Sequence, residues 1–164
     1  MLRIFLNNSF KVFLLYILID NSAFALGDRN SDGKVEIKVQ KNNLCFSVNH
    51  YKPKASFFRK QVDSNNLKLS HIGVSSKDRG YIWGIIKPIN NLDGALGLDS
   101  KKCISYGELL PNYNTNKSPA LLKTEQGYKV SIWSFNPEDN KAVVFSSLFD
   151  VEVSDTSIRV SKIY

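Results

Sequence analysis

From residue 33 onward, apolar and polar residues alternate along much of the chain. The alternation is clearest over 34–40, where Val35, Ile37 and Val39 share one face and the residues between them are polar. Because successive side chains of a β-strand point to opposite faces, this pattern predicts a strand with one buried face. Three polar residues then signal a turn before the alternation resumes over 44–48, so the two segments are expected to form a hairpin.

The same alternation recurs in later segments that are separated by turn-forming residues. The further expected strands are 68–74, 81–87, 129–135, 142–148, 149–153 and 157–163, with a short extended piece at 103–106. Helical periodicity is weak, and we expect at most one short helix, over 57–66. The sequence therefore predicts an all-β fold, a small antiparallel β-sandwich or partly open barrel of about seven to eight strands.

The first 25 residues have the three parts of a secretory signal peptide. Arg3 and Lys11 supply positive charge, 12–19 form a short apolar core, and Ala23-Phe24-Ala25 matches a small-x-small cleavage pattern. The apolar core is too short to cross a bilayer, which needs roughly twenty residues. We therefore expect 1–25 to be removed, leaving 26–164 as a single β domain. A buried N-terminal helix or a membrane anchor is the alternative.

The chain is basic, with a formal net charge of +7. Its cations form short clusters, such as Lys101-Lys102 and Arg59-Lys60, and do not gather in one long stripe. Dispersed charge on an exported protein argues against nucleic acid as a partner and favours an acidic protein or an anionic envelope surface.

Two cysteines, Cys45 and Cys103, follow the expected cleavage site. An even number of cysteines in an exported chain predicts one structural disulfide. This bridge would join the second expected strand to the middle of 89–119, a region rich in Gly, Pro, Asn and Ser that is typical of irregular connections. Metal binding is the alternative, but the chain lacks a C-x-x-C pair and neither histidine has ligand spacing to a cysteine.

The sequence contains no recognisable catalytic motif. It lacks G-x-S-x-G, H-E-x-x-H, and S-x-x-K with its companion motifs. His71 is interpreted as a strand histidine with a hydrogen-bond partner, and His50 as a solvated loop residue. Paired carboxylates for glycoside cleavage meet only in space, so no sequence pattern reveals them. We expect no enzyme activity and no cofactor.

One string resembles the start of a calcium-binding loop, in which oxygen ligands recur at alternate residues. It places Asp28, Asn30 and Asp32 before Gly33, but Val39 stands where the loop needs its bidentate glutamate. The preferred interpretation is a mobile tail that ends in an Asp-Gly turn, so no metal is expected. A calcium site at Asp28, Asn30 and Asp32 is the weaker alternative.

Aromatic side chains in the expected loops are the candidates for partner contact. Tyr51 and Phe57 lie in a loop with several cations that include Arg59, and Tyr106 and Tyr113 lie in the later irregular region. Aromatic residues and arginine often supply much of the binding energy of protein interfaces, and loops often hold such sites. We expect these five residues to contact a partner. Packing of Phe57 onto the core is the alternative.

Several short motifs follow one another along the chain: Asn42-Asn43-Leu44-Cys45-Phe46-Ser47-Val48, then Trp83, then Cys103-Ile104-Ser105-Tyr106-Gly107 with Pro111, then Tyr128-Lys129-Val130-Ser131-Ile132. In these motifs the chain resembles a group of small bacterial extracytoplasmic proteins and lipoproteins, many of them described as periplasmic immunity proteins of type VI secretion systems. The resemblance covers most of 26–164 and implies no catalytic residues. The chain departs from the lipoprotein members because no cysteine follows its signal core, so a soluble periplasmic form is implied.

The resemblance leads to one functional expectation. The chain is expected to be a periplasmic immunity protein that binds and neutralises a cognate toxin without catalysis. It is expected to have no nucleic-acid partner and no stable membrane anchor after cleavage. The alternatives are an envelope structural or adhesion β module, and an inhibitor of an envelope hydrolase such as lysozyme.

Overall fold

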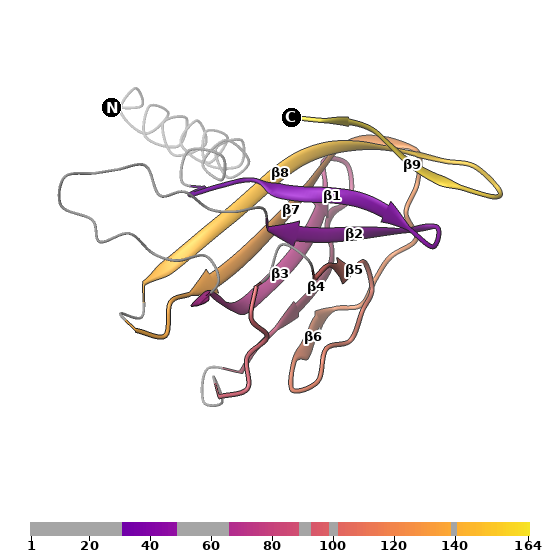
Figure 1. Cartoon of the computed structure of the whole chain (residues 1–164). Helices are drawn as coiled ribbons and strands as arrows, with labels where there is room; N and C mark the ends of the chain where they lie inside the picture. The colour runs from indigo at the N-terminus through magenta and orange to yellow at the C-terminus, as the bar shows by residue number, and fades with distance from the viewer. Residues whose placement is uncertain (1–30, 49–65, 89–92, 99–101, 139–140) are drawn as a thin grey trace, which may run out of the picture. The chain divides into compact units, whose positions relative to one another are not determined.

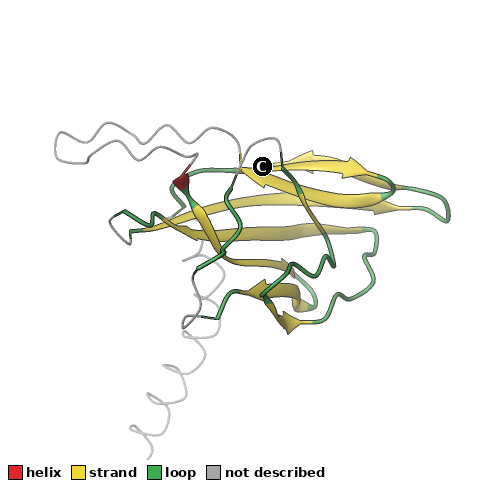
Figure 2. Cartoon of the chain, turned by 60° about the horizontal axis from the view of Figure 1, so that its bottom comes forward, coloured by secondary structure: helices red, strands yellow, loops and turns green. Residues whose placement is uncertain are grey.

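The computed structural model describes residues 31–48, 66–88, 93–98, 102–138 and 141–164 (Figure 1). Within these residues the chain forms nine strands: β1 (Val35–Gln40), β2 (Asn43–Val48), β3 (Lys68–Ser76), β4 (Gly80–Ile86), β5 (Ile104–Ser105), β6 (Asn114–Lys117), β7 (Glu125–Phe135), β8 (Ala142–Val153) and β9 (Ile158–Ile163). Apart from a helical turn at Asn66, the described part consists of strands and loops (Figure 2). Asp32–Tyr164 forms one compact unit.

The nine strands pair antiparallel in two open sheets. The smaller sheet has the order β1-β2-β5, and the larger has the order β6-β4-β3-β7-β8-β9. The all-β antiparallel prediction is confirmed, and two separate sheets correspond to its sandwich form. The larger sheet is built from two central hairpins, β3-β4 and β7-β8, which pair through β3 and β7.

Three differences from the sequence prediction concern the region 89–119, the segments 142–148 and 149–153, and the helix. Strand β6 lies inside the region expected to be irregular, because its four residues are all polar and exposed and so show no apolar alternation. The segments 142–148 and 149–153 form the single strand β8, so the described strands, with β6 and the two-residue strand β5 included, number nine. The helix expected over 57–66 lies outside the described residues except for Asn66.

Both sheets contribute side chains to one hydrophobic core. Phe46 of β2 contacts aromatic rings of the larger sheet. Its ring lies 6.3 Å from that of Trp83 on β4 and 6.2 Å from that of Phe149 on β8. All three side chains are fully buried. Burying a large apolar side chain contributes about 1.5–3 kcal/mol, so this aromatic centre stabilises the contact between the sheets.

The chain crosses between the sheets just before β1. Gly33 forms a parallel bridge with Phe145 of β8, and the amide of Asp32 donates to the carbonyl of Val144 at 2.7 Å. One step further along, the hydroxyl of Ser147 accepts from the amide of Val35 at 3.0 Å and donates to its carbonyl at 2.7 Å. These bonds hold the start of β1 against β8, so the chain passes from the larger sheet into the smaller one at a fixed point.

The predicted disulfide between Cys45 and Cys103 is present. Cys45 lies in β2, and the two Cα atoms are 5.5 Å apart with a sequence separation of 58 residues. The bond holds the chain before β5 against β2, where Cys45 pairs with Ser105 and Phe46 pairs with Ile104. In the chain-entropy model a loop of this size contributes about 4 kcal/mol to stability. A structural disulfide indicates an oxidising, extracytoplasmic environment.

Across the described residues, we find no helix with the length and apolar character needed to cross a membrane.

Candidate functional site

Three ring side chains from adjacent strands meet on the outer face of the larger sheet. Tyr81 belongs to β4, His71 to β3 and Trp133 to β7, and His71 is the direct cross-strand partner of Trp133. They lie on the outer face because their strand neighbours, such as Ile72 and Ile132, point into the core. We call Tyr81, His71 and Trp133 the aromatic patch.

Two glycines allow Tyr81 to lie flat across the sheet. Gly73 and Gly84 are cross-strand partners beneath its ring, and a Cβ atom on Gly73 would come within 2.6 Å of a ring carbon of Tyr81. A Cβ atom on Gly84 would collide with the phenol oxygen. Because neither glycine has a side chain, the phenol reaches His71, whose Nε2 shares a 2.8 Å hydrogen bond with it.

The rings of the patch hold one another in place. The imidazole of His71 lies between its neighbours, with ring centroids 6.3 Å from Tyr81 and 6.1 Å from Trp133, the second in an edge-on arrangement. Burial lowers the pKa of His71. Burial also raises the pKa of Tyr81, against a smaller opposing effect of a hydrogen bond with Asn116. Both side chains are therefore neutral near pH 7 and pack as uncharged rings.

The patch is exposed to an unusual degree for such residues. Trp133 is 51% exposed, Tyr81 is 37% exposed, and the neighbouring Ile86 is also 37% exposed. Contiguous exposed apolar side chains often mark interaction sites, and tryptophan and tyrosine are enriched among the residues that dominate binding energy. The patch can therefore act as a preformed anchor for a partner that covers the sheet.

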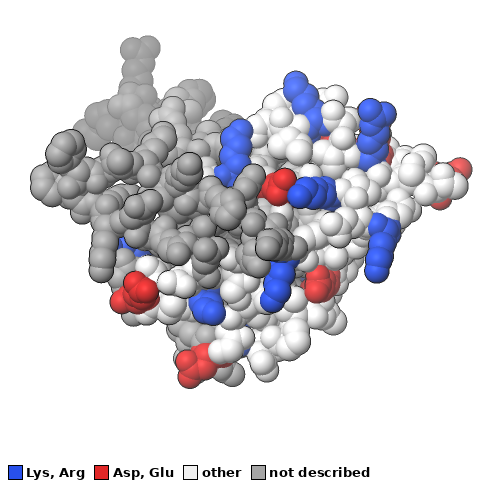
Figure 3. Space-filling model, viewed as in Figure 1, with Lys and Arg blue, Asp and Glu red and all other residues white. Residues whose placement is uncertain are grey.

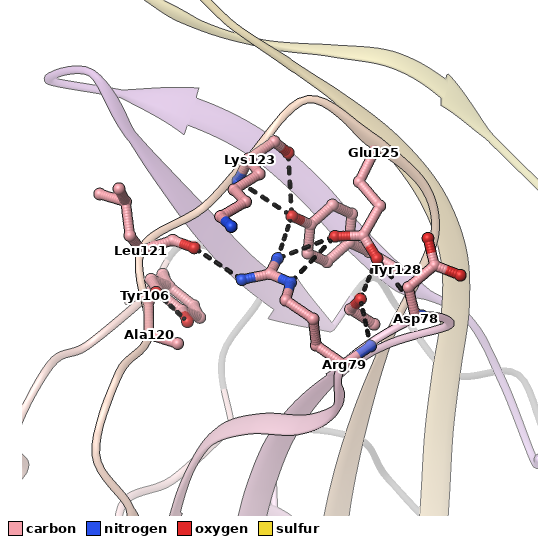
Figure 4. A network of polar contacts seen from close by, with 9 residues as sticks. Asp78, Arg79, Tyr106, Ala120, Leu121, Lys123, Glu125 and Tyr128 are labelled. Carbon is pink, nitrogen blue, oxygen red and sulfur yellow. Dashed lines mark hydrogen bonds and ion pairs between the residues drawn. The ribbon is translucent and has the colours of Figure 1, made fainter.

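A polar cluster around Arg79 joins the β3-β4 turn to the chain before β7 (Figure 4). The guanidinium of Arg79 donates to one carboxylate oxygen of Glu125 at 2.9 and 3.1 Å, to the carbonyl of Leu121 at 2.8 Å and to the hydroxyl of Tyr128 at 2.6 Å. The hydroxyl of Ser76 donates to the other oxygen of Glu125. The guanidinium of Arg79 and the hydroxyl of Ser76 therefore donate to acceptors within the cluster.

The charges of the cluster support one another. Desolvation alone would raise the pKa of Glu125, but hydrogen bonds from Ser76, Arg79 and the Asp78 amide, together with the charge of Arg79, lower it. Arg79 also lies 5.8 Å from the ring centroid of Tyr128. A carboxylate held in this way is engaged in structural contacts, so we assign the cluster to stability and not to partner contact.

The structure places two of the predicted contact residues inside the fold. Tyr106 is only 8% exposed, packs 5.2 Å from the ring of Trp83 and donates its hydroxyl to the carbonyl of Ala120 at 2.7 Å. Burial, the largest effect, raises the pKa of Tyr106 to about 12. Tyr113 is half-buried and donates its hydroxyl to the carbonyl of Leu69 at 2.8 Å. Both phenols bond to backbone groups of the fold, and partner contact at either residue stays a prediction.

Lys87 is a buried cation next to Tyr113. Its side chain is 1% exposed, and its ammonium lies 5.4 Å from the ring centroid of Tyr113. Among the described residues the ammonium has no hydrogen-bond partner. The aromatic face of Tyr113 provides a favourable contact for this ammonium, which gives Tyr113 a second structural role.

The remaining predicted site residues lie mostly outside the described residues: Tyr51, Phe57, Arg59, Asp28 and Asn30. Asp32 is described, and its carboxylate accepts the amide of Val144 at 3.0 Å. In the described residues, no three His, Cys, Asp or Glu side chains are grouped closely enough to hold a metal ion.

Sequence reasoning did not select the aromatic patch. It correctly interpreted His71 as a strand histidine with a hydrogen-bond partner, which is Tyr81. The missed signal was the alternation of inward and outward side chains along a strand. Within β7, Trp133 lies between the buried Ile132 and Ser134 and must therefore point outward. A large aromatic residue at an outward strand position was the available clue.

Comparison of the chain with protein-family models, with curated proteins and with solved structures finds no match.

Proposed function

We propose that this protein binds another protein through the aromatic patch, and that the partner is a toxin that it blocks in the periplasm as an immunity protein. The observation on which this rests is the half-exposed Trp133, held beside His71 and Tyr81 on a sheet face. The disulfide supports export, and the motif resemblance supports the class of partner.

Inhibition by occlusion fits the construction of the protein. The patch stands on the central strands β3, β4 and β7, and the core and the disulfide-linked smaller sheet lie behind it. A preformed surface loses little conformational entropy on binding, which favours affinity. The protein then needs only to cover a site on the toxin, without chemistry of its own.

The charge of the protein favours an acidic toxin surface. The whole chain has a formal net charge of +7, and Lys and Arg are spread over the face seen in Figure 3 without forming a single stripe. Spread charge of this kind accelerates encounter with an acidic partner more than it adds affinity. Association should therefore slow as ionic strength rises.

Co-expression with candidate toxins tests the proposal. Each toxin encoded beside this gene is directed to the periplasm of a test bacterium, with and without this protein. Protection by the native chain and its loss with Trp133→Ala supports the proposal. Leu109→Ser is the matched control, because Leu109 is 70% exposed and lies in the loop after β5 of the smaller sheet, whereas the patch belongs to the larger sheet. Killing that is equal with and without the native chain, for every toxin, would contradict it.

An envelope adhesion module remains the second candidate, because the sheets are open. Among the described strands, β6 and β9 form the edges of the larger sheet, and β1 forms an edge of the smaller one. Exposed edges can join β domains by strand pairing. Sedimentation of the purified protein separates the two functions, since an adhesion module would self-associate through its edges and an immunity protein would remain monomeric.

A further inference from the structure

A groove runs between β1 and β9, at the end of the larger sheet opposite β6. Its volume is about 590 Å³, and it is lined by Ile37 and Val39 of β1 and by all six residues of β9. Strand β1 is an edge of the smaller sheet and β9 is an edge of the larger one. The groove therefore lies where the two sheets each end in an edge strand.

One hydrogen bond shows which part of the molecule the edge of β9 faces. The amide of Ile158 donates to the side-chain carbonyl of Asn42, in the β1-β2 turn, at 2.7 Å. The free side of β9 thus faces the β1-β2 hairpin, and one of its amides already bonds to a group from outside the sheet. Unpaired backbone groups along an edge strand can pair with an added strand.

The side chains of the groove are apolar and cationic. Val39 is 39% exposed and Ile163 is 48% exposed, although both are large apolar residues. Arg159 and Lys162 supply two positive charges, and none of the residues that line the groove is acidic. Arg159 lies opposite Glu152 and Lys162 lies opposite Asp150 in the β8-β9 pairing. Within the described chain neither cation forms an ion pair with these carboxylates, and Lys162 lies 4.3 Å from the ring centroid of Tyr164.

We propose that this groove binds an extended segment of a partner protein in which acidic and apolar residues alternate. The backbone of the segment would bond to an edge strand, its apolar side chains would cover Val39 and Ile163, and its carboxylates would pair with Arg159 and Lys162. The acidic and apolar residues must alternate because successive side chains of an added strand point to opposite faces of the sheet. The site is distinct from the aromatic patch and does not depend on the proposed function.

Two alternative roles fit the side chains of the groove less well. Cations on an edge strand can serve only to prevent aggregation, but edges protected in this way have no need for exposed Val39 and Ile163 beside the charges. A second copy of this chain could occupy the groove, but a symmetric pair would bring Arg159 and Lys162 toward the same cations of the other copy. Like charges in such an arrangement oppose pairing.

Selection from a peptide library tests the proposal. A display library of random peptides of about ten residues, long enough for one strand, is selected on the purified protein, and the enriched peptides are synthesised. We expect Asp or Glu to alternate with Val, Ile or Leu in these peptides. We also expect the bound peptide to slow amide hydrogen exchange in β1 and β9.

Two pairs of variants locate the binding. Arg159→Gln should weaken the selected peptides about threefold, whereas Lys117→Gln, the same kind of change on the opposite edge strand β6, should leave affinity unchanged. Ile163→Ser should weaken binding, whereas Leu121→Ser should not. All four residues are exposed, so circular dichroism should show native folding in every variant.

Several results would overturn the proposal: no enriched peptide, enriched peptides without acidic residues, protection of other strands, or equal affinity of the Arg159 and Lys117 variants. Self-association that Ile163→Ser abolishes would assign the groove to a second copy instead. The toxin assay with Trp133→Ala is independent of all these measurements, so failure of one proposal is distinguishable from failure of the other.

Discussion

The imidazole of His71 and the phenol of Tyr81 share a 2.8 Å hydrogen bond across strands β3 and β4. The bond exists because Gly73 and Gly84 leave room for the phenol ring to lie against the sheet. An exposed aromatic side chain is usually free to change rotamer, but this one is held by the sheet beneath it and by the imidazole beside it. The patch that we propose as the binding surface thus depends on two residues that have no side chain.

We predict that Gly84→Ala disrupts the patch. The added methyl group would collide with the phenol of Tyr81, and forcing a side chain into occupied space costs about 1–3 kcal/mol. Thermal unfolding followed by circular dichroism and the fluorescence of the nearby Trp133 measure the effect. Gly97→Ala is the control, because its Cβ atom would meet only the ammonium of Lys68, at 3.8 Å. Equal melting temperatures for the two variants would contradict this packing.

We predict that His71 makes stability depend on pH. Its pKa in the folded protein is lowered from the ordinary value of 6.5 by burial, so the unfolded chain binds a proton at a higher pH. The free energy of unfolding should therefore decrease as pH falls below 6.5 and level off below the folded pKa. Urea unfolding of the native protein and of His71→Gln at several pH values isolates this effect. A constant difference between the two proteins would argue against it.

We predict that Glu125→Gln loosens the segment between β6 and β7. The change removes the charge that binds Arg79, and an uncompensated, partly buried guanidinium costs about 1–3 kcal/mol. Because the pKa of Glu125 is lowered from its ordinary value of 4.5, its contribution should be present above that pH. The contribution should be lost as pH falls through the folded pKa.

Denaturant unfolding near pH 7 and near pH 3 measures the role of Glu125. Glu152→Gln is the matched control, since Glu152 is exposed on β8 and outside the cluster. A larger effect of Glu125→Gln at the lower pH, or equal losses in the two variants, would show that the cluster contributes little.

We predict that replacing both cysteines by alanine lowers the free energy of unfolding by about 4 kcal/mol. Mass spectrometry of the exported protein under non-reducing conditions should also find Cys45 and Cys103 joined. Unfolding of the oxidised native protein and of the double variant in the same buffer provides the comparison. Two free thiols in the exported protein, or equal stabilities, would contradict a structural role.

The sequence predicted the strands better than it predicted the surface. Alternation identified β1, β2 and the main part of every long strand, because one face of each is buried against a common core. It could not reveal β6, whose side chains are all exposed, nor the order of strands in a sheet, which depends on pairing between distant segments. The disulfide was predictable from the cysteine count and the expected export.

The candidate site was harder to predict because exposure depends on tertiary packing. Tyr106 and Tyr113 lie in loops, which favoured partner contact in the sequence, yet their hydroxyls satisfy carbonyls within the fold. Trp133 lies in a strand, outside the loops from which the contact candidates were taken, yet it is half exposed. The alternation of side chains along a strand separates its two faces, but only the three-dimensional arrangement shows what covers each face. Partner contacts at Tyr51, Phe57, Arg59, Tyr106 and Tyr113 all stay predictions.

The bond between Cys45 and Cys103 closes a covalent ring that includes β3 and β4, whereas β1 and β9 remain outside it. Loss of the noncovalent packing would leave the ring intact, while the outer strands could detach one at a time. His71 and Tyr81 lie within this covalent ring, whereas the residues of the groove lie outside it. The disulfide therefore encloses only part of the patch, because Trp133 lies on β7, outside the covalent ring, and keeps its place beside His71 through sheet pairing.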